Sequence, residues 1–270
     1  EWQDERAEEK FDRVVTLSRQ LPQWRIRIAE DLTGRGLSRD RVLALALHLV
    51  DIGYFRAGGE QYADENESYG LATLLCEHVT VRQGSVSFDY PAKSGVQRAL
   101  EIDDAETVRA ARALVRRGRN GQRFLVCRTD SGWVDVHACD LNARFKEMVG
   151  PEYTVKDLRT WHATVLAARA FAGAAPPVSR RAARTASTTV MREVAEALGN
   201  TPAVARSAYV DPRVVTAYED GHTIAAAVRR TQRLRRAQAA QEILEKATRC
   251  LILRTARGHG GTPNVLRKSA

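Results

Sequence analysis

The chain has 270 residues, of which 44% are hydrophobic and 28% charged, and its mass of 30.0 kDa suits one large domain or two modest ones. This composition excludes a disordered chain and a collagen-like fibre, and no segment approaches the roughly 20 apolar residues of a membrane-spanning helix. Lysine and arginine outnumber aspartate and glutamate by 42 to 33, so the net charge of +9 favours a polyanionic partner.

Arginine supplies most of the positive charge, because only six of the 42 basic residues are lysines, which leaves 36 arginines. The flat guanidinium fork suits phosphate, although a GC-rich genome explains the preference for arginine equally well. The four cysteines form no C-x-x-C pair, so the sequence predicts neither a disulfide framework nor a zinc ribbon and favours a reducing compartment. The acidic N-terminal stretch lacks the regions of a secretory signal, and we expect none.

The N-terminal part of the chain is predicted to be helical. Apolar residues recur at intervals of three and four along residues 12–21 and 39–51, the spacing of side chains that share one face of a helix. Ser38 directly precedes the second segment and is a favoured N-cap residue, so we expect that helix to begin there.

A small antiparallel sheet is predicted next. Apolar residues alternate with polar ones on either side of the turn 82–85, which predicts a β-hairpin over residues 79–90. A second turn follows at 92–95, and residues 98–102 predict a third strand. Helical spacing then returns at 104–117.

The rest of the chain is predicted to be almost wholly helical. The expected helices cover residues 141–149, 155–171, 180–198, 203–209 and 224–253. Thr154 and Asp157 form a capping-box-like start for the second of these. Residues 255–270 are rich in glycine and basic without an acid, and we expect a flexible tail. The prediction is a mainly α fold with a small antiparallel β-sheet at about 79–102, and one folded region over 1–254.

Two segments in the first half of the chain carry residues suited to phosphate chemistry. Arg56 lies in Tyr54-Phe55-Arg56-Ala57-Gly58-Gly59-Glu60-Gln61-Tyr62, where a helix end runs into a polar loop that contains glycine, and the segment continues to residue 74. Lys93 lies in the turn 92–95. Each residue alone is typical of an exposed loop side chain.

Two further segments follow in the second half. Arg159 lies between Leu158 and Trp161 near the start of a predicted helix, where an arginine is most often a surface group with a buried stem. Residues 198–209 end at Tyr209, with Gly199 closing one helix and Thr201-Pro202 starting the next. A lone tyrosine there is typical of a core or interface aromatic.

Taken in order, these four segments resemble the poxvirus-like and bacterial type IB DNA topoisomerases, over about residues 9–212. The resemblance implies the catalytic fold that tyrosine recombinases and type IB topoisomerases share. It also implies that Tyr209 is the nucleophile, that Arg56 and Arg159 contact the scissile phosphate, and that Lys93 is the general acid. The small β-rich domain that usually precedes this region in the family is absent from the sequence, so we expect the isolated region to cleave weakly.

The resemblance implies further, secondary roles. Asn200 occupies a position where viral members have histidine and bacterial members commonly have asparagine, and it would add a neutral hydrogen-bond donor. Tyr62 and Lys156 would contact the DNA backbone near the cleavage point, and Lys156 is an alternative to Lys93 in proton transfer. A basic run in the last predicted helix would extend the DNA footprint, although such runs are usually solvated faces; it includes Arg229, Arg230 and Arg233.

The chemistry of strand cleavage explains why these residue types are needed. A phenol has a pKa of about 10 and must be activated by nearby positive charge or by a base. Guanidinium groups neutralise the charge of the pentacoordinate transition state, and a positioned acid is worth about 10²- to 10⁴-fold for a poor leaving group. The 3′-phosphotyrosine retains the bond energy, so resealing needs neither ATP nor metal. In agreement, there is no G-x-x-x-x-G-K-[ST] loop or metal-ligand spacing, and we expect no cofactor.

The sequence therefore predicts a type IB DNA topoisomerase that acts on double-stranded DNA as a monomer in the bacterial cytoplasm, at the nucleoid, without a membrane. A tyrosine site-specific recombinase is the first alternative, but recombinases usually have a histidine two residues before the second arginine, where this chain has Asp157. A non-catalytic basic DNA-binding module is the second.

Overall fold

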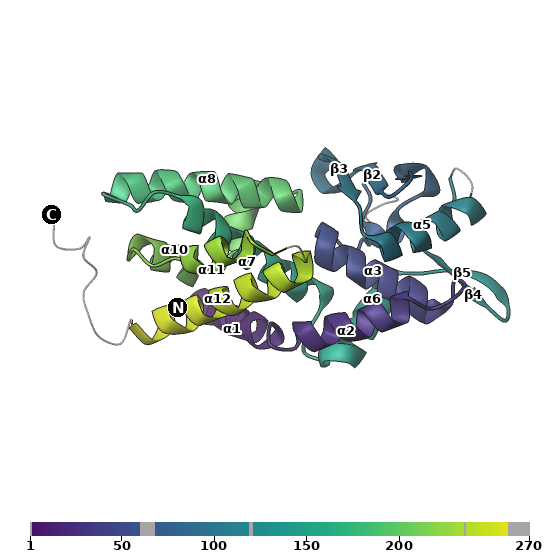
Figure 1. The fold of residues 1–270 in the computed structure, drawn as a ribbon, viewed down its shortest axis with the longest axis horizontal. Helices are drawn as coiled ribbons and strands as arrows, with labels where there is room; N and C mark the ends of the chain where they lie inside the picture. Colours follow the sequence, from purple (N-terminus) through teal and green to yellow (C-terminus); the bar gives the residue numbers. More distant parts are fainter. Residues whose placement is uncertain (1, 60–67, 119–120, 235, 259–270) are drawn as a thin grey trace. The chain divides into compact units, whose positions relative to one another are not determined.

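The computed structural model describes residues 2–59, 68–118, 121–234 and 236–258 (Figure 1). The chain divides into two compact units. Residues 20–159 form the first, called the middle unit below, and the terminal unit combines residues 1–19 with residues 160–270.

The middle unit combines helices with two small antiparallel sheets. Its helices are α2 (Leu21–Leu32), α3 (Arg39–Gly53), α5 (Ala105–Arg117) and α6 (Ala138–Val149), with short 3-10 turns at Leu71–Thr73, Cys76–His78 and Lys93–Gly95. The three-stranded sheet has the order β1 (Val79–Val81), β2 (Val86–Pro91), β3 (Gln97–Ile102), and the two-stranded sheet pairs β4 (Val126–Thr129) with β5 (Gly132–Asp135).

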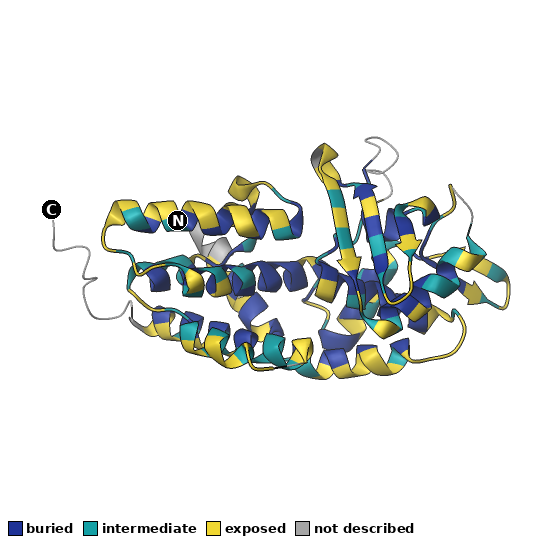
Figure 2. Cartoon of the chain, turned by 45° about the horizontal axis from the view of Figure 1, so that its top comes forward, coloured by how far each residue is buried: buried dark blue, intermediate teal, exposed yellow. Residues whose placement is uncertain are grey.

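Strand β2 forms the centre of the larger sheet and supplies one of its faces to the core. Val86, Phe88 and Tyr90 are buried while the residues between them are more exposed, and the changes of colour along the strands in Figure 2 follow this alternation. The Phe88 ring contacts Phe55 edge-on at 5.0 Å between centroids and Phe124 at 6.1 Å. The aromatic core therefore fixes the loop after α3 against the sheet.

The described residues of the terminal unit form helices joined by turns and loops, and no strand. It contains α1 (Trp2–Leu17), most of α7 (Val155–Gly173), α8 (Arg180–Leu198), α9 (Pro202–Val204), a π-helical turn (Ala205–Tyr209), α10 (Pro212–Glu219), α11 (Ala225–Thr231) and α12 (Ala237–Gly258). The Phe171 and Tyr218 rings stack at 4.6 Å, and the Tyr218 hydroxyl donates a hydrogen bond to the Ala175 carbonyl at 2.7 Å. These contacts hold α10 against the end of α7.

Much of the predicted pattern is confirmed. The hairpin and third strand lie at 79–102, and helices occupy the segments predicted from 39, 104, 141, 155 and 180 onward. Ser38 caps α3 by accepting a hydrogen bond from the Arg41 backbone N–H. No helix in the described ranges is both long and apolar enough to cross a membrane.

Three predicted helices differ from the structure. The first expected helix, 12–21, is interrupted because α1 ends at Leu17 and a new helix, α2, starts at Leu21 with Pro22 in its first turn. The segment 203–209 is a short α-helix that becomes a π-helical turn. The long helix expected at 224–253 is broken after Thr231, where the arginine-rich sequence places like charges four residues apart.

Other features were not anticipated. Helix α12 continues to Gly258, so residues 255–258 of the expected flexible tail are helical, and residues 259–270 lie outside the described ranges. The β4–β5 hairpin escaped prediction because Val126 and Cys127 are both buried and break the alternation. Helix α10 was also missed, although Asp211 and Pro212 are typical start residues.

Candidate active site

The backbone that carries Arg56 is fixed by the segment that follows the polar loop. Leu71 and Ala72 donate their backbone N–H groups to the carbonyls of Arg56 and Ala57, each at 2.8 Å. The two backbone segments cross at Gly58 and Gly70. They lie so close that a Cβ atom on Gly58 would be 2.9 Å from the carbonyl carbon of Gly70. The close crossing explains why this motif contains glycine at both places.

Arg56 and Arg159 both lie near one buried phenol, that of Tyr90. Tyr90 is 2% exposed and lies opposite Arg98 in the β2–β3 register. Burial raises the pKa of the Tyr90 hydroxyl, and the positive charges of Arg98, Arg159 and Arg56 oppose the rise. Two arginines that are far apart in the sequence thus act on the same buried phenol, while their sharing of one phosphate stays a prediction.

Arg98 is a third cation in this group that the sequence analysis did not single out. Its Nη2 donates to the Gly53 carbonyl at the end of α3 at 2.6 Å, and its guanidinium carbon lies 5.9 Å from the Phe55 ring centroid. Burial lowers the pKa of Arg98, and the charge of Arg56 lowers it further. The signal available in the sequence was its place opposite Tyr90 once the hairpin turn was located.

Arg159 lies in the first turns of α7 and is 2% exposed. The helix start is fixed by Asp157, whose Oδ2 accepts hydrogen bonds from the backbone N–H and hydroxyl of Thr154, both at 2.9 Å. The neighbouring Lys156 is exposed. Asp157, which occupies the position that a recombinase usually gives to histidine, therefore serves as a helix-capping carboxylate.

Lys93 lies at the tip of the β2–β3 hairpin. The 3-10 turn Lys93–Gly95 is closed by the Ala92 N–H, which donates to the Val96 carbonyl at 2.8 Å. Gly95 has a φ of 71°, which glycine adopts without strain. The Lys93 side chain is exposed, as an amine that must reach a bound strand would be.

Tyr209 ends the π-helical turn and is half-buried. Helix α8 stops at Gly199, whose φ of 63° is left-handed, and Asn200 follows directly. Thr201 caps the next helix by accepting a hydrogen bond from the Val204 N–H at 3.3 Å, as the sequence predicted. After the turn, the Tyr209 carbonyl accepts a hydrogen bond from Thr164 Oγ1 at 3.3 Å.

The predicted site residues are divided between the two units. Arg56, Lys93, Lys156 and Arg159 belong to the middle unit, whereas Asn200 and Tyr209 belong to the terminal unit together with the predicted DNA contacts of the last basic run. Tyr62 lies outside the described residues. The convergence of these side chains on one phosphodiester therefore stays a prediction.

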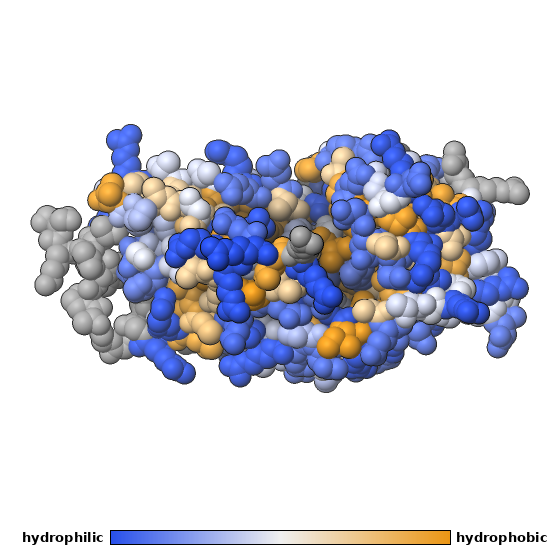
Figure 3. Space-filling view, viewed as in Figure 1, coloured by the Kyte–Doolittle hydropathy of each residue, from blue (hydrophilic) through white to orange (hydrophobic). Residues whose placement is uncertain are grey.

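The basic run of the terminal unit is exposed, but it does not lie on one helix face. Arg229 and Arg230 lie in the last turn of α11, and Arg233 follows the end of that helix. Hydrophilic side chains gather over the region of α11 in Figure 3. A second basic surface, missed in the sequence analysis, lies on α8, where three exposed arginines occur in the first five residues: Arg180, Arg181 and Arg184.

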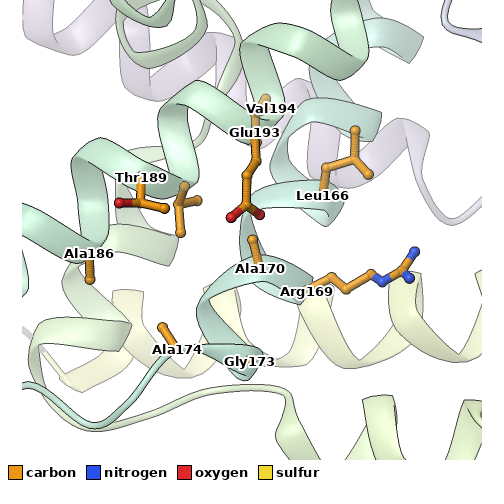
Figure 4. A pocket seen from close by; sticks show the side chains of 10 residues that line it. Leu166, Arg169, Ala170, Gly173, Ala174, Ala186, Thr189, Glu193 and Val194 are labelled. Atoms are coloured by element: carbon orange, nitrogen blue, oxygen red, sulfur yellow. The ribbon is translucent and has the colours of Figure 1, made fainter.

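A pocket of about 540 Å³ lies between α7 and α8 (Figure 4). Small and apolar side chains such as Ala170, Ala186 and Val190 line it, and the Glu193 carboxylate points into it. None of the predicted catalytic residues lines this pocket. Its carboxylate would repel a phosphate, so the pocket is not the candidate reaction site.

No group of three or more histidine, cysteine, aspartate or glutamate side chains in the described ranges is arranged to hold a metal ion. The cysteines are free, with Cys76 and Cys127 buried and Cys139 and Cys250 exposed.

Comparison with known proteins identifies the class. The family described as "Eukaryotic DNA topoisomerase I, catalytic core" matches residues 1–238, which is most of the chain. The chain therefore belongs to this family of type I DNA topoisomerases.

Individual relatives agree with this assignment. DNA topoisomerase 1B of Acanthamoeba polyphaga mimivirus is 26% identical over 220 residues, which cover 78% of this chain and 65% of the viral protein. DNA topoisomerase 1 of Daucus carota is 32% identical over 129 residues, covering 47% of this chain and 15% of the plant protein. DNA topoisomerase 1 alpha of Arabidopsis thaliana is 26% identical over 158 residues, which cover 58% of this chain and 16% of the plant protein. The chain thus spans just under two thirds of the viral relative and about a sixth of the plant relatives.

Proposed function

We propose that this chain is the catalytic region of a type IB DNA topoisomerase, which nicks one strand of duplex DNA, lets supercoils relax and reseals the strand without ATP or metal. The observation that carries the proposal is the grouping of Arg56 and Arg159 around Tyr90 in a chain of the topoisomerase family. Two guanidinium groups whose charges act on the same buried phenol would suit the non-bridging oxygens of a phosphodiester.

In the proposed reaction, the Tyr209 phenol oxygen attacks the phosphorus atom and gives its proton to bulk water, while the bond from phosphorus to the 5′ oxygen breaks. The departing oxygen takes a proton from Lys93, with Lys156 as the alternative donor. Arg56 and Arg159 neutralise the phosphoryl oxygens, and Asn200 adds a neutral donor. The same steps in reverse reseal the strand.

We place the chain in the poxvirus-like and bacterial branch because of Asn200 and the viral relative, and we propose bacterial origin, the cytoplasmic nucleoid and a monomeric enzyme as parts of this assignment. Residues 1–254 would form the catalytic region and 255–270 a basic extension. The recombinase alternative is disfavoured because Asp157 is engaged in capping α7.

The deciding assay is relaxation of supercoiled plasmid in EDTA without ATP, followed by a quench in denaturant. We expect relaxed topoisomers and a protein covalently bound to the 3′ end of the nicked strand, with both absent in Tyr209→Phe. Relaxation that persists in Tyr209→Phe would assign the nucleophile elsewhere. Duplex binding without an adduct in the parent chain would favour the non-catalytic alternative, and a requirement for a defined site would favour the recombinase.

A further inference from the structure

The turn that carries Tyr209 is held by the N-terminal helix α1. Lys10 Nζ donates a hydrogen bond to the carbonyl oxygen of Ala208, across 198 positions of the sequence. The Lys10 side chain is half-buried, and its ammonium group lies 4.5 Å from the Phe11 ring centroid. Both residues belong to the terminal unit.

The Ala208 carbonyl is one of the last of a helical segment, where carbonyl oxygens lack partners within the helix and carry partial negative charge. A lysine ammonium is a favourable partner at this place. The next carbonyl, that of Tyr209, lies 3.3 Å from Thr164 Oγ1, whose single proton it shares with the Thr160 carbonyl at 3.0 Å; Thr164 is 1% exposed. The peptide groups on both sides of the Tyr209 Cα atom are therefore fixed by other helices.

Helix α1 is also fastened to the segment just after the nucleophile. Arg213 donates to Asp12 Oδ1 at 2.6 Å and to Asp211 Oδ2 at 2.7 Å. The Asp211 backbone N–H donates to Thr164 Oγ1 at 3.1 Å. The 208–213 segment is thus attached to α1 on either side of Tyr209, so α1 is part of the support of this turn.

We propose that Lys10 is a positioning residue for strand cleavage, which fixes the Ala208–Tyr209 peptide so that the phenol oxygen keeps its direction of attack. This inference rests on the proposed function. A catalytic group must be held within about 10–20° of its productive direction, and a displacement of about 1 Å costs about 10²-fold in rate. Lys10 touches no reacting atom in this account and acts only through the backbone of Tyr209.

The test uses Lys10→Met, which keeps an unbranched side chain but removes the donor and the charge beside the Phe11 ring, and Lys10→Arg, which keeps a donor and the charge. Lys246→Met is the matched control, because Lys246 is exposed on α12 in the same unit and its loss removes the same charge. Single-turnover covalent cleavage of a duplex with a short leaving strand is measured, together with duplex affinity, thermal melting and amide hydrogen exchange at residues 205–210.

We expect Lys10→Met to slow cleavage by about 10²-fold and to slow resealing of a preformed adduct by a similar factor, because one misplacement affects both directions. Duplex affinity and melting should match those of Lys246→Met, and Lys10→Arg should restore most of the rate. Exchange at 205–210 should accelerate in Lys10→Met alone.

Cleavage by Lys10→Met at the rate of the control would overturn the proposal. Loss of folding in both Lys10 variants would also overturn it, since the contact would then serve stability. If the parent chain forms no adduct, the proposed function fails, whereas the exchange measurement still reports whether Lys10 orders the turn.

Discussion

Replacing Gly70 by alanine should impair strand cleavage although Gly70 carries no reactive group. The substituted residue has a φ of −127°, which any residue adopts, so backbone strain plays no part. The effect comes from the added methyl group, which would lie 2.7 Å from the Gly58 nitrogen and 3.2 Å from the Arg56 carbonyl oxygen.

The size of the effect follows from these distances. Ordinary contacts to a Cβ atom begin at 3.4 Å, so the backbone segment at Gly58 or the one at Gly70 must move by several tenths of an ångström. Such overpacking typically costs about 1–3 kcal/mol of stability. The segment at Gly58 also carries Arg56, so its movement would displace the Arg56 side chain. We therefore expect a loss of cleavage rate that approaches the roughly 10²-fold caused by misplacing a catalytic group by about 1 Å.

Gly59→Ala is the matched control, since no atom of the described residues lies within 4 Å of its added methyl group and its backbone is not left-handed. Thermal melting and single-turnover cleavage of a duplex are compared for the two variants and the parent. Cleavage by Gly70→Ala as fast as by Gly59→Ala would show that the crossing does not position Arg56, and the reasoning would be refuted.

Three further outcomes can be measured. Asp157→Ala removes the cap of α7 and should cost about 0.5–2 kcal/mol in the free energy of unfolding, measured by urea denaturation; no loss would mean that the cap contributes nothing. The hydrogen bond from His48, followed by those from Thr107, lowers the pKa of the Asp104 carboxyl well below its ordinary range, against the effect of burial. That stabilisation is therefore present above pH about 4 and lost as the pH falls further, and Asp104→Asn should flatten this part of the stability profile; an unchanged profile would contradict it. Three exposed arginines of the terminal unit are Arg229, Arg230 and Arg233. If each contacts one phosphate, neutralising any one of them should reduce the slope of log affinity against log salt concentration by about 0.9. An unchanged slope would exclude that arginine from the duplex interface.

Local signals predicted the parts of this fold that depend on neighbouring residues. Ser38 begins α3, Gly199 ends α8 and Thr201 begins α9, because a cap forms with residues two or three positions away. The three-stranded sheet was equally accessible, since its alternation and its turns lie within one short stretch. Where the local pattern continued across a break, as between α11 and α12, it predicted one helix too few.

The contacts that position the candidate site could not be predicted from local sequence signals. The crossing of Gly58 and Gly70, the gathering of arginines at Tyr90 and the bond from Lys10 to Ala208 all join segments that no periodicity relates. The roles of the site residues came instead from the order of the motifs and their resemblance to one family.

The arginine group at Tyr90 connects stability to binding in the middle unit. Burial disfavours the charged form of Arg98, and the like charge of Arg56 disfavours it further. A phosphodiester placed beside them would offset both effects, because an anion in a partly desolvated site interacts strongly with fixed cations. The arrangement that costs stability in the free chain would therefore favour a bound phosphate, as expected where a functional site departs from local structural rules.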